Sequence, residues 1–290
     1  MSSVSSFDIR DLRVGYGDRP VLDGIDLSLA PGQITAIIGA NACGKSTLLR
    51  AMSRLLAPER GEVLLDGRSV HRTAPRKLAQ CLGLLPQSPI APEGITVLDL
   101  VSRGRHPHHG LFGRWTAEDD RAVAEALEAT GTAALSERPV EALSGGQRQR
   151  VWIAMVLAQR TDVLLLDEPT TFLDINHQIE VLDLLTDLNR RHGTTIVMVL
   201  HDLNLAARYA DRIVAIADGQ IYRHGPAKEV LTTAMLHDIF GLASRIVTDP
   251  VSGKPMMIPL GRHGILSNVQ DTVAPLSSDH ETDQSTEGLS

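Results

Sequence analysis

Short apolar runs recur along the chain, and segments with helical patterns separate them. Runs of this length predict buried strands, and their alternation with helices predicts an α/β fold with a parallel sheet. A membrane-spanning helix needs about 18 or more apolar residues in a row, so we do not expect the chain to cross a bilayer itself. The six runs are Ile34–Ile38, Val63–Leu65, Leu82–Leu85, Val163–Leu166, Ile196–Leu200 and Ile213–Ile216.

The strand pattern stops in the middle of the chain, between Thr96 and Arg160. Apolar residues in this stretch recur at helical spacing instead. We therefore expect a helical subdomain, at about residues 88–160, inserted into the sheet domain. The helical segments are Leu98–Ser102, Glu118–Thr130 and Gln147–Gln159.

A long amphipathic helix is predicted directly after Asp174, whose side chain can cap its N-terminus. Apolar residues recur from Ile175 to Leu188, and Gly193 can end the helix. The apolar stripe should pack on the sheet. By contrast, residues 268–290 are rich in Ser, Thr and acidic residues and are expected to be disordered, because they cannot offset the entropy cost of ordering.

The composition fits a globular protein of the reducing cytosol. Hydrophobic residues make up 43% of the 290 residues, and the formal net charge is -7. The acidic balance argues against binding to nucleic acid, and 3% aromatic residues are too few for base-stacking platforms. Cys43 and Cys81 are too few for a disulfide framework, and the first residues lack the basic and apolar regions of a secretory signal.

A Gly-rich segment, GANACGKST, matches the phosphate-loop pattern GxxxxGK[ST] between a predicted strand and a predicted helix. Its backbone N–H groups can surround the phosphates of a nucleotide, Lys45 can reach the β- and γ-phosphates, and Ser46 can ligate Mg²⁺. The alternative is an ordinary Gly-rich turn. The predicted ATP-binding residues are Gly39, Ala40, Asn41, Ala42, Cys43, Gly44, Lys45, Ser46 and Thr47.

Two further strand ends carry polar residues suited to the same chemistry. Asp167 and Glu168 follow an apolar run, where Asp167 can hold Mg²⁺ and Glu168 can polarise the attacking water. A solvated acidic turn before Pro169 is the alternative. His201 ends another apolar run, at the edge where α/β sheets bind ligands, and suits a γ-phosphate contact, although a histidine at a strand end is, taken alone, more often a capping or packing residue.

The motif LSGGQ, at Leu143–Gln147, precedes a predicted helix. Ser144 is placed to cap this helix, and the adjacent Gly145 and Gly146 leave free N–H groups at its positive end. Gln147 completes the motif. On these grounds alone a second phosphate contact and a mere helix cap remain equally open.

These motifs, in the order GANACGKST, LSGGQRQR, VLLLDEPTTFLD and VLHD, resemble the ATP-binding subunits of ABC transporters. The resemblance covers about residues 7–240. It implies a P-loop NTPase (RecA-like) parallel sheet core with an antiparallel N-terminal β subdomain and an inserted helical subdomain. The ATPase domain is then expected at residues 7–245, a C-terminal extension at 246–267 and the disordered tail at 268–290.

The resemblance also assigns roles to single residues. It implies that Tyr16 stacks on adenine, that Gln87 reaches the metal and the reaction centre, and that His201 acts as the switch histidine. Thr171–Asp174 resembles the D-loop, and Ser144–Gln147 the signature that contacts ATP on a second copy of the chain. The expected catalytic residues are Glu168, His201, Gln87 and Lys45, and the expected Mg²⁺ ligands are Ser46, Gln87 and Asp167.

Three positions depart from the family pattern. The phosphate loop has Ala40 and Ala42 where this family often has Pro and Gly, and the D-loop has Phe172 where a small residue is usual. Ala42 needs a backbone angle that Gly tolerates better, so we expect tighter geometry with retained ATP binding. Cys43 lies near a helix N-terminus and Lys45, which can lower its thiol pKa, although a simple packing role is the preferred interpretation.

The segment Leu85–Trp115 resembles the importer ATPases for ferric siderophores, haem and cobalamin, and its GRHP and LFGRW stretches are nearest to the siderophore group. This implies uptake of an iron(III)–siderophore complex, with a haem or cobalamin importer as the alternative. The expected partners are a second copy, transmembrane permease subunits and, indirectly, an extracytoplasmic substrate-binding protein. The chain is expected at the cytoplasmic face of the inner membrane, as a peripheral subunit.

The same segment contains the expected permease contacts, which are its Arg-Gly pairs, Pro107, Phe112 and Trp115. His106, His108 and His109 invite a metal site, but they lack carboxylate or thiolate company. Two rival functions stay open: a non-transport ABC ATPase that acts on DNA or ribosomes, and a P-loop kinase. The first usually has a coiled-coil insert or a second cassette, and the second would lack LSGGQ; export in place of import is also open.

Overall fold

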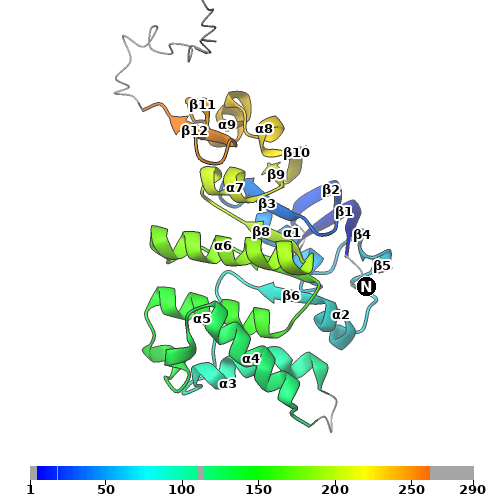
Figure 1. The fold of residues 1–290 in the computed structure, drawn as a ribbon. Coiled ribbons are helices and arrows are strands. Elements are labelled where there is room, and N and C mark those ends of the chain that lie inside the picture. Colours follow the sequence, from blue (N-terminus) through cyan, green and yellow to red (C-terminus); the bar gives the residue numbers. More distant parts are fainter. Residues whose placement is uncertain (1–4, 18, 110–113, 262–290) are drawn as a thin grey trace, which may run out of the picture.

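The computed structural model describes residues 5–17, 19–109 and 114–261. The expected disordered tail, at residues 268–290, lies outside these ranges. The central sheet has the order β10-β9-β3-β8-β7-β6, and a second sheet has the order β2-β1-β4-β5 (Figure 1). The strands of the two sheets are β1 Phe7–Tyr16, β2 Arg19–Leu29, β3 Ile34–Gly39, β4 Arg60–Leu65, β5 Arg68–Ser69, β6 Leu82–Leu85, β7 Val163–Asp167, β8 Thr195–Val199, β9 Arg212–Ala217 and β10 Gln220–Gly225.

The central sheet is parallel from β9 to β6, and β10 closes it as an antiparallel edge strand. Strands β3, β7 and β8 are buried along their whole length. Strands buried on both faces read as continuous apolar runs, which explains the sequence pattern. The predicted α/β fold with a parallel sheet is confirmed.

The antiparallel sheet packs over α1 (Lys45–Met52) on one face of the central sheet, because Phe7, Leu48 and Ile37 share one core cluster. The apolar run Val63–Leu65 belongs to this sheet, since β4 pairs with β1 and not with the central strands. Its assignment to the parallel sheet was therefore wrong. A three-residue apolar run predicts burial but contains no information about the direction of its partner strand.

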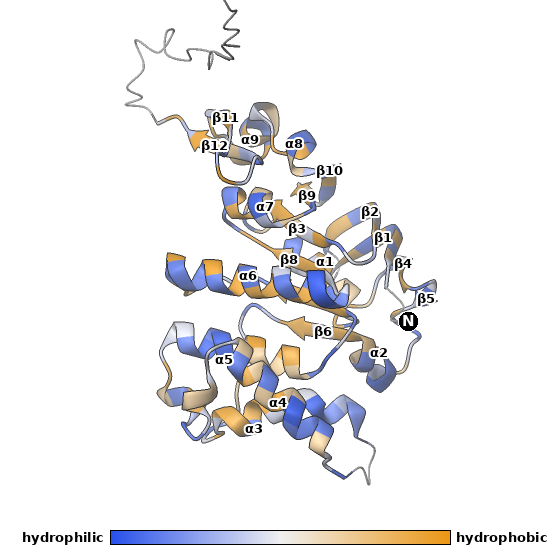
Figure 2. Ribbon diagram, viewed as in Figure 1, coloured by the Kyte–Doolittle hydropathy of each residue, from blue (hydrophilic) through white to orange (hydrophobic). Residues whose placement is uncertain are grey.

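The helices between β6 and β7 lie together beyond β6 and α6, in the lower part of the view (Figure 1). Val97, Val123 and Trp152 come from α3, α4 and α5 and are buried in one shared core. The figure of residue hydropathy shows apolar strands inside the molecule and polar faces on the outer helices (Figure 2). The helices are α1 Lys45–Met52, α2 Pro75–Cys81, α3 Val97–Ser102, α4 Ala117–Ala129, α5 Gly145–Ala158, α6 Ile175–His192, α7 Leu203–Tyr209, α8 Ala227–Val230 and α9 Thr233–Phe240, with 3₁₀ turns η1 Arg103–His108, η2 Ala133–Leu135 and η3 Val140–Ala142.

Helix α6 has the predicted ends. The Asp174 side chain accepts a hydrogen bond from the His177 N–H, and Gly193 adopts a left-handed φ of 69° after the last turn. Val181, Leu182 and Leu185 are buried, whereas Ile175 is 77% exposed and lies outside the packed stripe. The predicted helix is confirmed, but its first apolar position does not face the sheet.

A two-stranded hairpin, β11 (Ser244–Thr248) and β12 (Pro255–Pro259), follows α9. It is attached to α7 by two hydrogen bonds, since Asn204 Nδ2 donates to Met257 O at 3.1 Å and Met257 N donates to Asn204 Oδ1 at 2.7 Å. The expected domain boundary between residues 245 and 246 falls inside β11. The start of the hairpin therefore does not coincide with the expected start of the C-terminal extension.

Candidate nucleotide site

The phosphate loop connects the end of β3 to the start of α1, and two of its glycines are required by close packing. A Cβ on Gly39 would lie 2.3 Å from the Ile216 carbonyl oxygen, and a Cβ on Gly44 would lie 2.5 Å from Leu22 Cδ2. Both residues also have a positive φ, of 155° and 112°. A side chain at Gly39 would collide with backbone, whereas one at Gly44 would displace the Leu22 side chain and strain the loop at its positive φ.

Ala42 has a φ of 61°, in the left-handed region that a Cβ disfavours by about 1–2 kcal/mol. The expected demand on its backbone is confirmed. The neighbouring Cys43 is buried, and burial raises the pKa of its thiol although Lys45 opposes this effect. The expectation of a lowered thiol pKa was therefore wrong, because desolvation outweighs the nearby ammonium; packing in the core is what the structure supports.

Lys45 is 5% exposed and folds back onto its own loop. Its Nζ donates to the Gly39 carbonyl oxygen at 2.9 Å and to the Ala40 carbonyl oxygen at 2.7 Å. An ammonium has three N–H donors, so one donor remains for a ligand. The two loop contacts fix the position from which that donor acts.

Ser46 and Asp167 meet although they are far apart in the sequence. Ser46 Oγ donates to Asp167 Oδ1 at 3.0 Å. Burial raises the pKa of the Asp167 carboxyl above its ordinary value, while the hydrogen bond from Ser46 opposes this shift. A hydroxyl and a buried carboxylate thus converge beside the phosphate loop, at the carboxyl end of β7.

Glu168 is the centre of a second cluster at the same sheet edge. Its Oε1 accepts from Gln87 Nε2 at 2.9 Å and lies 2.6 Å from His201 Nε2, while its Oε2 accepts from Thr171 Oγ1 at 3.1 Å. Glu168 is 9% exposed and has a φ of 56°, a conformation that costs of the order of 1–3 kcal/mol and is often found at functional sites. The structure thus brings Gln87, Glu168 and His201 together. The contact of Thr171 with Glu168 was not predicted, although Thr171 follows Glu168 by only three residues in the sequence.

Tyr16 lies at the end of β1 and is 49% exposed. Its hydroxyl accepts a hydrogen bond from Arg50 Nη1 at 2.7 Å, and Arg50 belongs to α1, directly after the phosphate loop. The ring is thereby held on the same side of the molecule as the loop. Sequence reasoning did not identify Arg50.

The phosphate loop and the acidic end of β7 thus lie at one sheet edge. A family model described as ABC transporter matches residues 22–171. The chain belongs to the ABC transporter family. The ATP-binding subunits of this family bind ATP and hydrolyse it to drive transport. This subunit thus has the fold, the phosphate loop and the acidic strand end that its motifs predicted.

Two relatives and one solved structure resemble this ABC ATPase along most of its length. It is 53% identical over 262 residues to the achromobactin transport ATP-binding protein of Dickeya dadantii, covering 90% of this chain and 96% of the relative. It is 50% identical over 260 residues to the ferric enterobactin transport ATP-binding protein of Escherichia coli, covering 90% and 96%. A structure of an ABC transporter assigned to the metal-chelate type, in an inward-facing conformation, matches with a TM-score of 0.76 at 28% identity, covering 89% and 98%.

The LSGGQ motif of this ABC ATPase begins α5 with a reciprocal cap. Ser144 Oγ accepts from the Gln147 N–H at 3.3 Å, and Gln147 Oε1 accepts from the Ser144 N–H at 3.1 Å. The predicted cap is confirmed. Within the described residues, no hydrogen bond links residues 144–147 to residues 39–47, and α5 and α1 pack in different core clusters, since Trp152 belongs to one and Leu48 to the other. A single chain therefore does not bring these two motifs together.

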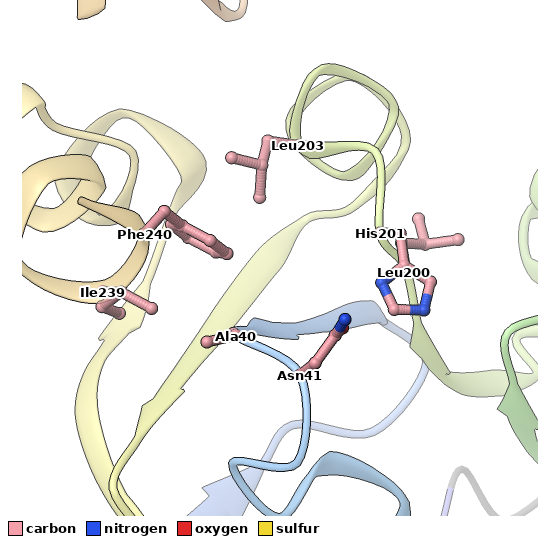
Figure 3. A pocket seen from close by; sticks show the side chains of 8 residues that line it. Ala40, Asn41, Leu200, His201, Leu203, Ile239 and Phe240 are labelled. Atoms are coloured by element: carbon pink, nitrogen blue, oxygen red, sulfur yellow. The ribbon is translucent and has the colours of Figure 1, made fainter. Parts of the chain in front are cut away.

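An open hollow lies next to the phosphate loop of the subunit, between β3, α7 and α9 (Figure 3). Its volume is about 340 Å³. Sequence reasoning could not find it, because its walls come from segments that are distant in the chain. It is lined by Gly39, Ala40, Asn41, Leu200, His201, Leu203, Ile239 and Phe240.

The Arg-rich segment after Gln87 differs from its expected role. Gly104 and Arg105 are buried, and a Cβ on Gly104 would lie 2.2 Å from the Met155 carbonyl oxygen. Arg105 Nε donates to Asp119 Oδ1 at 2.9 Å. Gly104 and Arg105 are therefore internal, and their assignment as permease contacts was wrong. Of the two aromatic residues expected to contact the permease, Trp115 is 45% exposed and Phe112 lies outside the described residues.

The histidines of this segment have separate surroundings. His108 Nε2 lies 2.8 Å from the Gln159 carbonyl oxygen, and His109 stacks on Trp115 with a centroid distance of 5.7 Å. Over residues 5–17, 19–109 and 114–261 there is no group of three or more His, Cys, Asp or Glu residues that could hold a metal ion. Over the same ranges, every helix is too short or too polar to cross a bilayer.

Proposed function

We propose that this ABC ATPase energises the import of an iron(III)–siderophore complex, and that its site hydrolyses ATP with the residues predicted from the sequence. The main support is the cluster around Glu168, in which a buried carboxylate lies next to Gln87 and His201 at the sheet edge where the phosphate loop begins. The transport functions named for the two relatives support the choice of cargo.

The phosphate loop, residues 39–47, would hold the nucleotide through its backbone N–H groups at the N-terminus of α1. The third N–H of Lys45 would contact the β- and γ-phosphates while the other two keep the loop closed. The exposed ring of Tyr16 would stack on adenine. Each contact uses a group whose direction is already fixed by a neighbouring hydrogen bond.

The site fits Mg²⁺, which takes oxygen ligands and usually keeps only one or two carboxylates besides phosphates and water. The Ser46 hydroxyl and the Asp167 carboxylate lie 3.0 Å apart and supply such a pair, with the Gln87 carbonyl oxygen as a third candidate ligand. When held by these residues, Mg²⁺ would supply positive charge that offsets the charge of the phosphates. Because a single carboxylate suffices, the absence of a three-residue metal cluster among the described residues does not conflict with this assignment.

Glu168 is the proposed general base, because its carboxylate is nearly buried and is oriented by hydrogen bonds from Gln87 and Thr171. It would align the attacking water and accept its proton. His201, 49% exposed at its side chain, would contact the γ-phosphate from the end of β8. The contact between His201 and Glu168 would keep both groups at the reacting end of the nucleotide.

The separation of residues 39–47 from residues 144–147 within one chain supports a dimer of two copies. In that dimer each ATP lies between the phosphate loop of one copy and Ser144–Gln147 of the other. The N–H groups at the start of α5 would then contact the γ-phosphate of the partner's nucleotide. The dimer would bind two permease subunits at the cytoplasmic face of the inner membrane, and an extracytoplasmic protein would deliver the siderophore.

A Glu168→Gln variant tests the hydrolytic assignment. It keeps the size and shape of the side chain but cannot accept the proton of water, so we expect retained ATP binding, turnover reduced by about 10²–10⁴-fold and an ATP-trapped dimer. Glu180→Gln, an exposed change on α6, is the control and should leave turnover unchanged. Parental turnover in Glu168→Gln would contradict the assignment of the base.

Uptake of radiolabelled iron tests the cargo. A strain that lacks this subunit should lose uptake of its ferric siderophore and regain it with the parent chain but not with Glu168→Gln. If the strain keeps ferric siderophore uptake but loses haem or cobalamin uptake, the cargo assignment is wrong although the ATPase assignment stands.

A further inference from the structure

Phe172 presents a large apolar side chain to solvent on a fixed segment. It is 77% exposed, and its backbone has a left-handed φ of 65°. The residues on both sides are held in place, since Gln149 Nε2 donates to the Pro169 carbonyl oxygen at 3.1 Å and Gln178 Nε2 donates to the Leu173 carbonyl oxygen at 3.2 Å. A large apolar side chain that is already held in place can pack against a second molecule at a small cost in conformational entropy.

The hollow beside the phosphate loop can accommodate an aromatic ring. Its volume is about 340 Å³, whereas an apolar cavity of about 150 Å³ is enough to bind benzene. Leu203, Ile239 and Phe240 point toward it from α7 and α9, opposite Ala40 (Figure 3). Among the described residues that line it, none carries a carboxylate, ammonium or guanidinium group.

We propose that Phe172 of each copy inserts into this hollow of the other copy. The inference rests on the dimer proposed above, in which Ser144–Gln147 faces the partner's phosphate loop. Phe172 adjoins that motif, because a Cβ on Gly145 would lie 3.5 Å from Phe172 Cβ. The hollow in turn adjoins the phosphate loop, because Ala40 and Asn41 line it.

One two-fold axis therefore relates both contacts, that of residues 144–147 with the partner's phosphate loop and that of Phe172 with the partner's hollow. A two-fold rotation that brings residues 144–147 to the partner's phosphate loop also brings Phe172 toward the partner's hollow, and the contact is made twice. Burial of two aromatic rings adds an apolar contribution to dimer affinity that does not come from the nucleotide. The aromatic residue at a position where small residues are usual is thus explained by the hollow across the interface.

The first test measures dimerisation in the Glu168→Gln background with ATP, by sedimentation velocity. Loss of two buried rings in Phe172→Ala should raise the dimer dissociation constant by at least about 100-fold. Val251→Ala removes another exposed apolar side chain, 79% exposed on the C-terminal hairpin, and should leave this constant unchanged. ATP affinity of the monomer and the melting temperature should be unchanged in both variants, which excludes misfolding as the cause.

The second test is a crosslink between Phe172→Cys and Phe240→Cys introduced in one chain, with Cys81→Ser and Glu168→Gln. Oxidation should give a covalent dimer with ATP, and neither single cysteine variant should give it. If the parent dimerises with ATP but Phe172→Ala leaves the dissociation constant unchanged and no crosslink forms, the inference is wrong and the proposed function stands. If ATP induces no dimer at all, the proposed function and the inference both fail.

Discussion

Replacement of Asp119 by Asn would leave the guanidinium of Arg105 buried without its counter-charge. The two side chains are 3% and 7% exposed, and Arg105 Nη1 also donates to the Ala158 carbonyl oxygen at 2.9 Å. Removal of one partner of a buried ion pair typically costs about 3–5 kcal/mol, because the remaining charge stays desolvated. Asn keeps one acceptor oxygen for the donors of Arg105 and Thr116 but turns its NH2 group toward the other, so we expect a loss of at least about 3 kcal/mol.

The pH dependence gives this loss a second signature. Burial alone raises the pKa of Asp119, but hydrogen bonds from Thr116 and Arg105 outweigh it and lower the pKa well below its ordinary value of 3.8. A lowered folded-state pKa contributes stability above the ordinary value, and this contribution is lost as the pH falls toward the folded-state value. The deficit of Asp119→Asn should therefore be full at neutral pH and shrink below about pH 4.

Urea and thermal unfolding measure the effect. A loss of about 3 kcal/mol should lower the melting temperature by about 6–12 °C in a domain of this size. Asp187→Asn is the matched control, because it breaks an exposed pair with Arg191 at 3.0 Å and should cost under about 0.5 kcal/mol. If Asp119→Asn and Asp187→Asn cost the same, the argument from burial would be refuted.

Three further predictions concern the nucleotide site. Lys45→Ala removes a charge-assisted phosphate contact and should weaken ATP binding by about 10–100-fold in calorimetry, whereas Lys228→Ala, at an exposed position, should not. Burial raises the pKa of Asp167 above its ordinary value, so the folded state disfavours the ionised carboxylate. The free energy of unfolding therefore falls as the pH rises from the ordinary pKa through the raised one. Asp167→Asn should therefore melt above the parent at neutral pH without Mg²⁺, and equal or lower melting there would count against this. Gly39→Ala should cost more stability than Gly67→Ala, because both have a positive φ but only the Cβ on Gly39 meets backbone within 4 Å; equal costs would show that the close approach is unimportant.

Local sequence was sufficient wherever the chemistry lies on one continuous segment. The phosphate loop needs only a strand, glycines at two positions with a positive φ and a following helix, and all of these are adjacent in the chain. The caps of α5 and α6 were likewise readable, because a side chain bonds to N–H groups only three residues away. The need for a left-handed angle at Ala42 also followed from the motif itself.

Only the tertiary structure decided which distant groups meet and which are withdrawn from solvent. Parallel pairing of Leu85 with Leu166, and of Asp167 with Val199, aligns the strand ends that bring Gln87, Glu168 and His201 together. Two expectations were reversed by tertiary contacts. Burial raises the pKa of the Cys43 thiol, which we expected to be lowered, and Arg105 pairs with the buried Asp119, so it does not face a permease. The sequence by itself thus determined the motifs and their chemistry. The burial of Cys43 and Arg105, and the hollow that Phe240 helps to line, depend on contacts between distant segments, which no local pattern encodes.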